Sequence, residues 1–275
     1  MILVAQLSDL HIREGGALAY GRVDTARHLR EAIAHLNGLR PRPGAVAVTG
    51  DLVELGTEAE YRTCLAMLGA LEIPWCPLPG NHDGPDFWQA MPLPPGAEMA
   101  PGIGYVAGVG AARLVMLDTS LPGRPDGEVT EARAAWLAAT LAAEPAPPTL
   151  LFMHHPPIET GIAHMDSIGC GGIARLAGAL SAAETLLAIG CGHVHRTIAG
   201  QIAGCPVMIC PSPAHAVSLA LDPETPASFH LEPPGILLYR LTERSGAWSC
   251  AVHLSQIGRY EGPHGFFAED GGRLA

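Results

Sequence analysis

Lysine is missing from this sequence of 275 residues, so all 16 basic residues are arginine. This absence excludes a P-loop lysine, a Schiff-base lysine and a serine–lysine dyad as catalytic groups. Aspartate and glutamate together number 27, which gives a formal net charge of −11. Because duplex nucleic acid is usually bound by a basic face, we expect no such partner. A small anionic substrate stays compatible with the charge, since bound divalent metal ions offset it locally.

Signals for membrane insertion and secretion are lacking as well. No apolar run approaches the roughly 18 residues that indicate a transmembrane helix, so we expect no membrane contact. Residues 1–7 have neither the basic segment nor the cleavage site of a signal peptide. The seven cysteines are odd in number, form no C-x-x-C pair and lie mostly in apolar runs, which is typical of buried thiols. This pattern predicts a cytoplasmic protein.

Apolar runs alternate with helical patterns through the first two thirds of the chain. Strands are predicted at residues 2–7, 45–49, 75–78, 113–118, 149–154 and 185–190. Helices are predicted at residues 24–38, 57–71, 130–143 and 172–182, with N-caps at Asp24, Thr57 and Thr130 and a capping box from Thr57 to Glu60. Such alternation predicts an α/β fold with parallel strands, in which ligands bind beyond the carboxyl ends of the strands.

The last third of the chain changes character, because no helical pattern follows Thr185. Strands are predicted at residues 196–203, 206–211, 214–221, 235–241 and 248–254, with a hairpin turn at Arg244-Ser245-Gly246. We expect a catalytic domain over residues 1–230, followed by a hairpin and tail over residues 231–275. Apolar residues on both faces of this hairpin predict self-association. The alternative is that the hairpin completes a second sheet of the same chain.

Five short motifs rich in metal ligands follow one another along the chain, and each comes directly after an apolar run. They are Asp9-Leu10-His11, Gly50-Asp51, Gly80-Asn81-His82-Asp83, His154-His155-Pro156-Pro157 and Gly192-His193-Val194-His195. Aspartate, asparagine and histidine form a ligand set that suits two adjacent metal ions able to activate water against a phosphate ester. No single motif is specific, but the ordered set is.

Spacing within the motifs predicts which side chains converge. Asp9 and His11 are two residues apart, so an extended strand end would turn both to one side. The same holds for His193 and His195. A carboxylate such as that of Asp51 can bridge two cations, and Asn81 offers a neutral oxygen. His82 is expected to point to the substrate, whereas His155 is expected to serve in packing or to support a ligand.

In their order and composition, the five motifs resemble those of the calcineurin-like metallophosphoesterases. The resemblance implies a four-layer α-β-β-α sandwich and two metal ions, chosen from Fe, Mn, Zn and Co. One ion would be held by Asp9, His11, Asp51 and His195, and the other by Asp51, Asn81, His154 and His193. It also implies hydrolysis by a metal-bound hydroxide, with His82 at the phosphate or the leaving group.

Differences between this sequence and the motifs of two other metallophosphoesterase branches indicate which branch it resembles. Glu54 stands where purple acid phosphatases carry a metal-binding tyrosine, and the phosphate-clamping arginine of the protein Ser/Thr phosphatases is absent. In length and motif spacing, the whole chain is similar to the glycerophosphodiesterases and class III cyclic-nucleotide phosphodiesterases. That likeness implies small phosphodiester substrates, with Tyr20, Met165 and His215 beside them. Asn81 and His82 are also expected to contact the substrate. It also implies dimers or larger homo-oligomers, with the C-terminal hairpin contributing to a cap.

Three alternatives to a phosphodiesterase are open from the sequence. A phosphomonoesterase or nucleotidase would use the same scaffold and differ in the walls of its pocket. A nuclease is disfavoured by the acidic charge and the absence of lysine. A non-catalytic interaction protein would have lost ligands, whereas all seven positions are present here.

Overall fold

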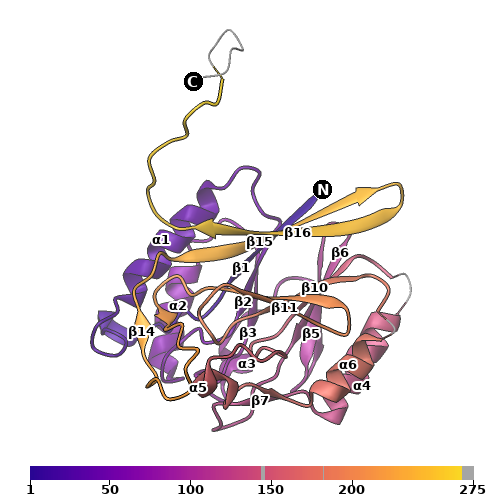
Figure 1. Cartoon of the computed structure of the whole chain (residues 1–275), viewed down its shortest axis with the longest axis horizontal. Coiled ribbons are helices and arrows are strands. Elements are labelled where there is room, and N and C mark those ends of the chain that lie inside the picture. The colour runs from indigo at the N-terminus through magenta and orange to yellow at the C-terminus, as the bar shows by residue number, and fades with distance from the viewer. Residues whose placement is uncertain (144–145, 182, 268–275) are drawn as a thin grey trace.

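Two β-sheets pack face to face in the computed structural model, which describes residues 1–143, 146–181 and 183–267 (Figure 1). The first sheet has five strands in the order β16 (Ala247–Gln256), β15 (Gly235–Arg244), β1 (Ile2–Leu7), β2 (Ala45–Thr49) and β3 (Trp75–Leu78). The second has seven, in the order β11 (Ile198–Ile202), β12 (Cys205–Ile209), β10 (Leu186–Cys191), β8 (Thr149–Phe152), β6 (Ala112–Leu117), β5 (Gly104–Val109) and β4 (Glu98–Ala100).

Helices cover the outer face of each sheet. Helices α1 (Thr25–Gly38) and α2 (Glu58–Leu68) lie against the five-stranded sheet, and α4 (Glu131–Ala142) and α6 (Ile173–Leu180) lie against the other, on the opposite side of the molecule (Figure 1). A third apolar cluster fills the space between the sheets. The short elements are η1 (Glu14–Gly16), α3 (Phe87–Ala90), α5 (Ala163–Asp166), and the strand pairs β7 (Gly127–Glu128) with β9 (Cys170–Gly171) and β13 (Ala216–Val217) with β14 (Phe229–His230). The predicted four-layer sandwich is confirmed.

Alternating burial along the strands explains the layers. In β1, Val4 contributes to the cluster between the sheets. Ala5 and Leu7, which lie on the other face of the strand, contribute to the cluster beneath α1 and α2. In β6, Leu114 and Val115 divide in the same way between the inner cluster and the cluster beneath α4 and α6. Successive side chains of a strand face opposite sides, so each sheet is apolar on both faces and needs cover on both.

Parallel pairing was predicted, and it is found along β1–β2–β3 and along β6–β8–β10–β12. Their carboxyl ends therefore meet at one edge of the sandwich. Strands β4 and β5, which pair antiparallel at the far edge of the larger sheet, were not predicted. Two elements are shorter than predicted: α2 ends at Leu68, and the strand expected at 214–221 is limited to Ala216–Val217.

The capping predictions hold for three helices, since Asp24, Thr57 and Thr130 each accept a hydrogen bond from a main-chain N–H of the first turn. Only half of the capping box forms, however. Glu60 does not reach back to Thr57, because its carboxylate accepts instead from the Leu55 N–H and from Arg13. The buried Glu60 thus anchors the segment before α2 instead of closing the cap.

The C-terminal hairpin is part of the five-stranded sheet. Its turn has positive φ at Ser245 and Gly246, as the tight turns that suit the twist of hairpins require. Strand β15 pairs antiparallel with β1, and Leu237 and Tyr239 are fully buried between the sheets. The hairpin therefore completes a sheet of the same chain, which was the alternative given to self-association. Self-association and the boundary at residue 230 stay predictions, and residues 268–275 of the tail lie outside the described part.

Candidate metal centre

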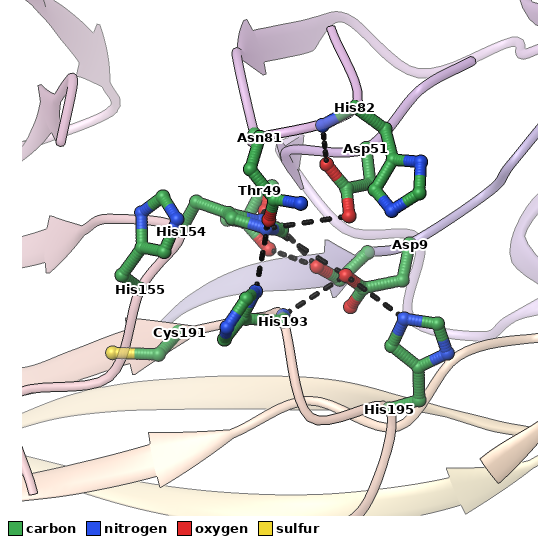
Figure 2. A network of polar contacts seen from close by, with 12 residues as sticks. Asp9, Thr49, Asp51, Asn81, His82, His154, His155, Cys191, His193 and His195 are labelled. Carbon is green, nitrogen blue, oxygen red and sulfur yellow. Dashed lines mark hydrogen bonds and ion pairs between the residues drawn. The ribbon is translucent and has the colours of Figure 1, made fainter. Parts of the chain in front are cut away.

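The five motifs come together at the edge where the parallel strands end (Figure 2). The loops after β1, β2 and β3 supply side chains from the first sheet, and the loops after β8 and β10 supply them from the second. All seven candidate metal ligands lie in this one cluster: Asp9, His11, Asp51, Asn81, His154, His193 and His195. Residues up to 186 positions apart along the chain thus meet because both sheets end at the same edge.

The backbone at these positions is not extended, and the geometric reason given from the sequence is wrong. The φ angles are 57° at Asp9, 47° at His11, 50° at Asp51, 72° at His193 and 55° at His195. All five are left-handed, a conformation that is uncommon for residues other than glycine and that gathers at functional sites. The side chains converge because each loop turns sharply at the end of its strand, and not because alternate residues of a straight strand share a face.

One group of donors surrounds the space between His11 and His195. Their Nε2 atoms lie 3.2 Å apart. The Nε2 atom of His195 is 3.5 Å from Asp9 Oδ1, and that of His11 is 3.6 Å from Asp51 Oδ2. The Nδ1–H of His11 donates to Glu54 at 2.7 Å, so its Nε2 lone pair faces the other donors. Two imidazole nitrogens and two carboxylates directed at one point form a set that suits a divalent cation.

A second group of donors surrounds Asn81. The Asn81 Oδ1 atom lies 3.2 Å from His154 Nε2 and 3.0 Å from His193 Nδ1. The other nitrogen of each ring faces a main-chain carbonyl, that of Thr49 at 2.8 Å for His154 and that of Ile168 at 3.1 Å for His193. With those nitrogens protonated, both rings direct lone pairs at an oxygen that is also an acceptor. Such an arrangement repels unless a proton or a metal cation lies between them.

The Asp51 carboxylate stands between the two groups. Its Oδ1 atom accepts the His82 main-chain N–H at 2.8 Å, which fixes the carboxylate, while Oδ2 is 3.6 Å from His11 Nε2 and 3.5 Å from His154 Nε2. Asp9 differs, because its Oδ1 atom accepts the His193 N–H at 2.9 Å and is also the oxygen that lies 3.5 Å from His195 Nε2. The buried Oδ2 atom of Asp9 has no hydrogen-bond partner among the described residues. Asp51 thus keeps Oδ2 directed at both groups of donors, and Asp9 has one buried oxygen left without a partner.

The pKa shifts of the site in the absence of a cation also indicate a cation-binding site. Burial alone would lower the pKa of His154, but the Asp51 and Asp9 carboxylates and the Thr49 carbonyl together outweigh burial and raise that pKa to about 9. Burial raises the pKa of Asp9 to about 6 and lowers that of His193 to about 3. A proton on His154 therefore compensates the buried carboxylates, and a bound cation would replace it, since metal ligands must be deprotonated.

Close packing explains the glycines of two motifs, Gly50 and Gly80. A Cβ atom at Gly50 would lie 2.2 Å from His154 Nδ1. A Cβ atom at Gly80 would lie 2.2 Å from Asp51 Oδ1 and 2.5 Å from the Asp51 main-chain nitrogen. Both values are far below any normal contact, so the loops can bring their donors together only where the side chain is absent.

Two acidic residues that were not predicted as site residues hold the loops in place. Asp83 accepts hydrogen bonds from the main-chain N–H groups of Gly80, Leu52 and Val53, and so ties the third motif to the second. Burial raises the pKa of its carboxyl to about 7. Glu54 contacts His11, as described above. Asp83 belongs to the Gly-Asn-His-Asp motif, and Glu54 follows Asp51 closely, but neither position by itself indicates such contacts.

The two other histidines of the motifs differ in their surroundings. His82 directs Nδ1 at the Glu54 main-chain carbonyl at 2.9 Å, and its side chain is 32% exposed. It belongs to the wall of the cavity over the centre. His155 is fully buried, with Nδ1 2.9 Å from Thr119 Oγ1, and lines none of the cavities around the centre.

A cavity of about 270 Å³ lies over the donors, and it is lined by all five residues that were predicted to contact the substrate: Tyr20, Asn81, His82, Met165 and His215. Tyr20 is 46% exposed, Met165 is buried, and the His215 ring packs 4.5 Å from the ring of His195. Phe229 of β14 completes this wall by packing against both Tyr20 and His215. Phe229 was not predicted, because nothing in the sequence indicates that β14 returns to the first motif.

A larger cavity of about 580 Å³ shares Asn81 and His82 with the first. Its far wall includes Trp88 and Leu121. The Trp88 indole N–H donates to Asp118 at 3.2 Å, and Asp118 also accepts from the Ser120 N–H and hydroxyl. These bonds hold the wall in one arrangement.

Comparisons with known proteins agree with this geometry. The sequence profile described as calcineurin-like phosphoesterase matches residues 2–197. The chain is 37% identical over 272 residues to a probable glycerophosphodiester phosphodiesterase of Arcobacter nitrofigilis, covering 98% of each chain. It is 31% identical to a cAMP/cGMP dual specificity phosphodiesterase of Mycobacterium tuberculosis, covering 80% of this chain and 70% of that one. A dimetal phosphatase from Danio rerio shares the fold, with a TM-score of 0.61 at 14% identity over 94% of this chain and 99% of that one. The chain therefore belongs to the calcineurin-like phosphoesterase family.

Proposed function

We propose that this protein hydrolyses small phosphodiesters at a centre of two metal ions. The observation that carries the proposal is the position of Asp51 Oδ2, 3.6 Å from His11 Nε2 and 3.5 Å from His154 Nε2, between the two groups of donors. Asp9, His11 and His195 would hold one ion with Asp51, and Asn81, His154 and His193 would hold the other with it. When bound, two such ions lower the pKa of water and neutralise charge on the phosphate oxygens.

The residues of the chain have separate tasks in this reaction. Asp51 keeps the two groups of donors in register, because its Oδ1 atom is anchored by the His82 N–H. His82 presents Nε2 to the substrate, since its Nδ1 engages the Glu54 carbonyl. A histidine held in this way can donate a proton to the departing alkoxide or stabilise the phosphoryl group. Tyr20, Met165 and His215 would contact the remainder of the substrate.

Two features favour a diester over a monoester. Two cavities meet at Asn81 and His82, so a phosphate placed there has room for two ester arms. The first cavity has no arginine in its wall, and the chain has no lysine. Arg133 lines the second cavity, but its guanidinium donates to the main-chain carbonyls of Glu128 and Ser120. A monoester dianion needs more positive charge than a diester monoanion, and the chain supplies little at this point. Glycerophosphodiesters and cyclic nucleotides, on which the two relatives are named as acting, are the diesters we expect to be cleaved.

The finer properties belong to the same proposal. Carboxylate and amide oxygens beside imidazole accommodate Fe, Mn, Zn or Co. Free thiols at all seven cysteines fit a reducing compartment, and we propose the cytoplasm. Among the described residues, no helix is long and apolar enough to cross a membrane. A homodimer or larger assembly through the C-terminal hairpin is the expected state.

Turnover of bis(p-nitrophenyl) phosphate and p-nitrophenyl phosphate tests the activity. We expect the diester to be the better substrate, chelation to abolish turnover, and Mn²⁺ or Co²⁺ to restore it. Asp51→Ala should lose bound metal or all turnover. A protein that cleaves only the monoester would be a phosphomonoesterase, and activity at full rate without bound metal would contradict the centre itself.

The second cavity gives a sharper test of the diester. Leu121→Trp should fill part of the cavity whose wall Leu121 forms. The variant should lose kcat/KM for phenyl p-nitrophenyl phosphate while keeping it for methyl p-nitrophenyl phosphate, because only the bulky arm needs the space. An equal loss for both substrates, or none for either, would show that no ester arm occupies this cavity.

A further inference from the structure

Glu54 contacts two functional histidines at once. Its carboxylate Oε2 accepts a hydrogen bond from His11 Nδ1 at 2.7 Å, and its main-chain carbonyl accepts one from His82 Nδ1 at 2.9 Å. The carboxylate is close to His82 as well, with Oε1 3.9 Å from the same Nδ1 atom. The Glu54 side chain is only 9% exposed, so these contacts form in a largely water-free environment where charged hydrogen bonds are strong.

The bond to His11 decides which nitrogen of that ring can bind a metal ion. A carboxylate can only accept, so the proton must reside on Nδ1, and the Nε2 lone pair is left facing His195 Nε2 and Asp51 Oδ2. Two other candidate ligands have only weaker hydrogen-bond acceptors behind their rings. His154 faces the Thr49 carbonyl and His193 faces the Ile168 carbonyl, both uncharged acceptors. His11 alone of these three has a carboxylate behind it, which adds basicity as well as direction.

We propose that Glu54 is a positioning residue that fixes the tautomer and direction of His11 for metal binding and holds His82 against the same centre. The inference rests on the proposed dinuclear centre. The sequence alone does not reveal this task of Glu54. The purple acid phosphatases carry a metal-binding tyrosine at this position, whereas Glu54 acts on the metal ion indirectly, through its hydrogen bond to His11.

Glu60 provides a control for the possibility that Glu54 only stabilises the loop around it. That buried carboxylate accepts from the Leu55 N–H at 2.7 Å and from Arg13 at 2.9 Å, so it holds the residue next to Glu54 without touching any histidine of the centre. Loss of its charge should loosen the same segment. Glu60→Gln therefore separates a general disturbance of the loop from loss of the contact with His11.

The test is metal binding by the full-length protein, stripped of metal and titrated with Mn²⁺ in a calorimeter. Glu54→Ala should weaken one of the two binding events by about 10–100-fold and leave the other close to wild type, which is the usual effect of removing such a partner. Glu54→Gln should fall between Glu54→Ala and wild type, because its amide oxygen still accepts from Nδ1–H but carries no charge. Glu60→Gln should lower Tm while keeping both affinities.

Nitrogen-15 spectra of the Zn²⁺-loaded protein give a second readout, independent of turnover. The His11 ring should be protonated at Nδ1 in wild type and in Glu54→Gln. Wild-type affinities in Glu54→Ala, or an equal loss in Glu60→Gln, would overturn the inference. If Glu54→Ala does not fold, Glu54→Gln replaces it in the test. An unchanged Mn²⁺ affinity in Glu54→Gln together with a changed His11 tautomer would also overturn the inference. A wild-type protein that binds no Mn²⁺ at all would instead refute the proposed centre.

Discussion

Gly80→Ala introduces a single methyl group at the most crowded point of the site. The added Cβ atom would lie 2.2 Å from Asp51 Oδ1, 2.5 Å from the Asp51 main-chain nitrogen and 2.8 Å from His154 Cε1. The backbone of Gly80 has no left-handed φ that would itself disfavour alanine, so the effect is steric. A flexible side chain could move aside, but the Asp51 nitrogen cannot move without displacing the loop after β2.

The expected loss of stability follows from this crowding. Inserting a methyl group into a well-packed site destabilises a protein by about 1–3 kcal/mol. At roughly 2–4 °C for each kcal/mol in a domain of this size class, Tm should fall by about 2–12 °C. Displacement of Asp51 also separates the two groups of donors, so the variant should bind fewer metal ions. In wild type, Mn²⁺ at a concentration of 100 times Kd should stabilise the fold by about 2.7 kcal/mol and so raise Tm. In Gly80→Ala this rise in Tm should shrink or vanish.

Thermal unfolding with a chelator and with excess Mn²⁺ measures both effects, and metal content is counted on the same samples. Gly178→Ala is the matched control, because a Cβ atom there meets no atom within 4 Å and the residue lies inside α6. That substitution should raise stability by about 0.5–1 kcal/mol, since alanine is the better helix former. If Gly80→Ala binds two metal ions and unfolds at the wild-type temperature, the close packing described for this site is wrong.

Three further expectations concern other parts of the molecule. His82→Ala should retain both metal ions while turnover falls by about 10²–10⁴-fold, as for a positioned proton donor, and loss of metal from this variant would make His82 a ligand. Burial raises the pKa of all seven cysteine thiols, to about 11 for Cys250, so at pH 8 the folded protein should react slowly with a disulfide reagent and the unfolded protein rapidly. Rapid reaction of all seven thiols in the folded state would contradict their burial. Light scattering at micromolar concentration should detect a homodimer or larger assembly of the 28.7 kDa chain, and Ala251→Arg on the open edge of β16 should weaken it; a monomeric wild type would reject self-association.

Local patterns were sufficient to predict most of the fold. Helical spacing and N-cap residues predicted α1, α2, α4 and α6 to within a few residues, because these signals act between neighbours in the chain. The antiparallel β4 and β5 were missed, since β4 has only three residues and β5 has two glycines and no clear alternation. The predicted capping box formed only in part, because the buried Glu60 carboxylate pairs instead with Arg13, which is 47 positions away in the chain.

For the centre itself, the sequence determined which side chains are available and that they follow strand ends. Placing the carboxyl ends of parallel strands at one edge is a general property of such sheets, so the seven candidate ligands could be named before the structure was known. Tertiary structure alone decided how they meet. The left-handed φ angles of Asp9, His11, Asp51, His193 and His195, and the contacts of Glu54 and Phe229, depend on loops from both sheets packing against one another. Those loops are far apart in the chain, and a pattern that extends over a few residues cannot encode the distance between them.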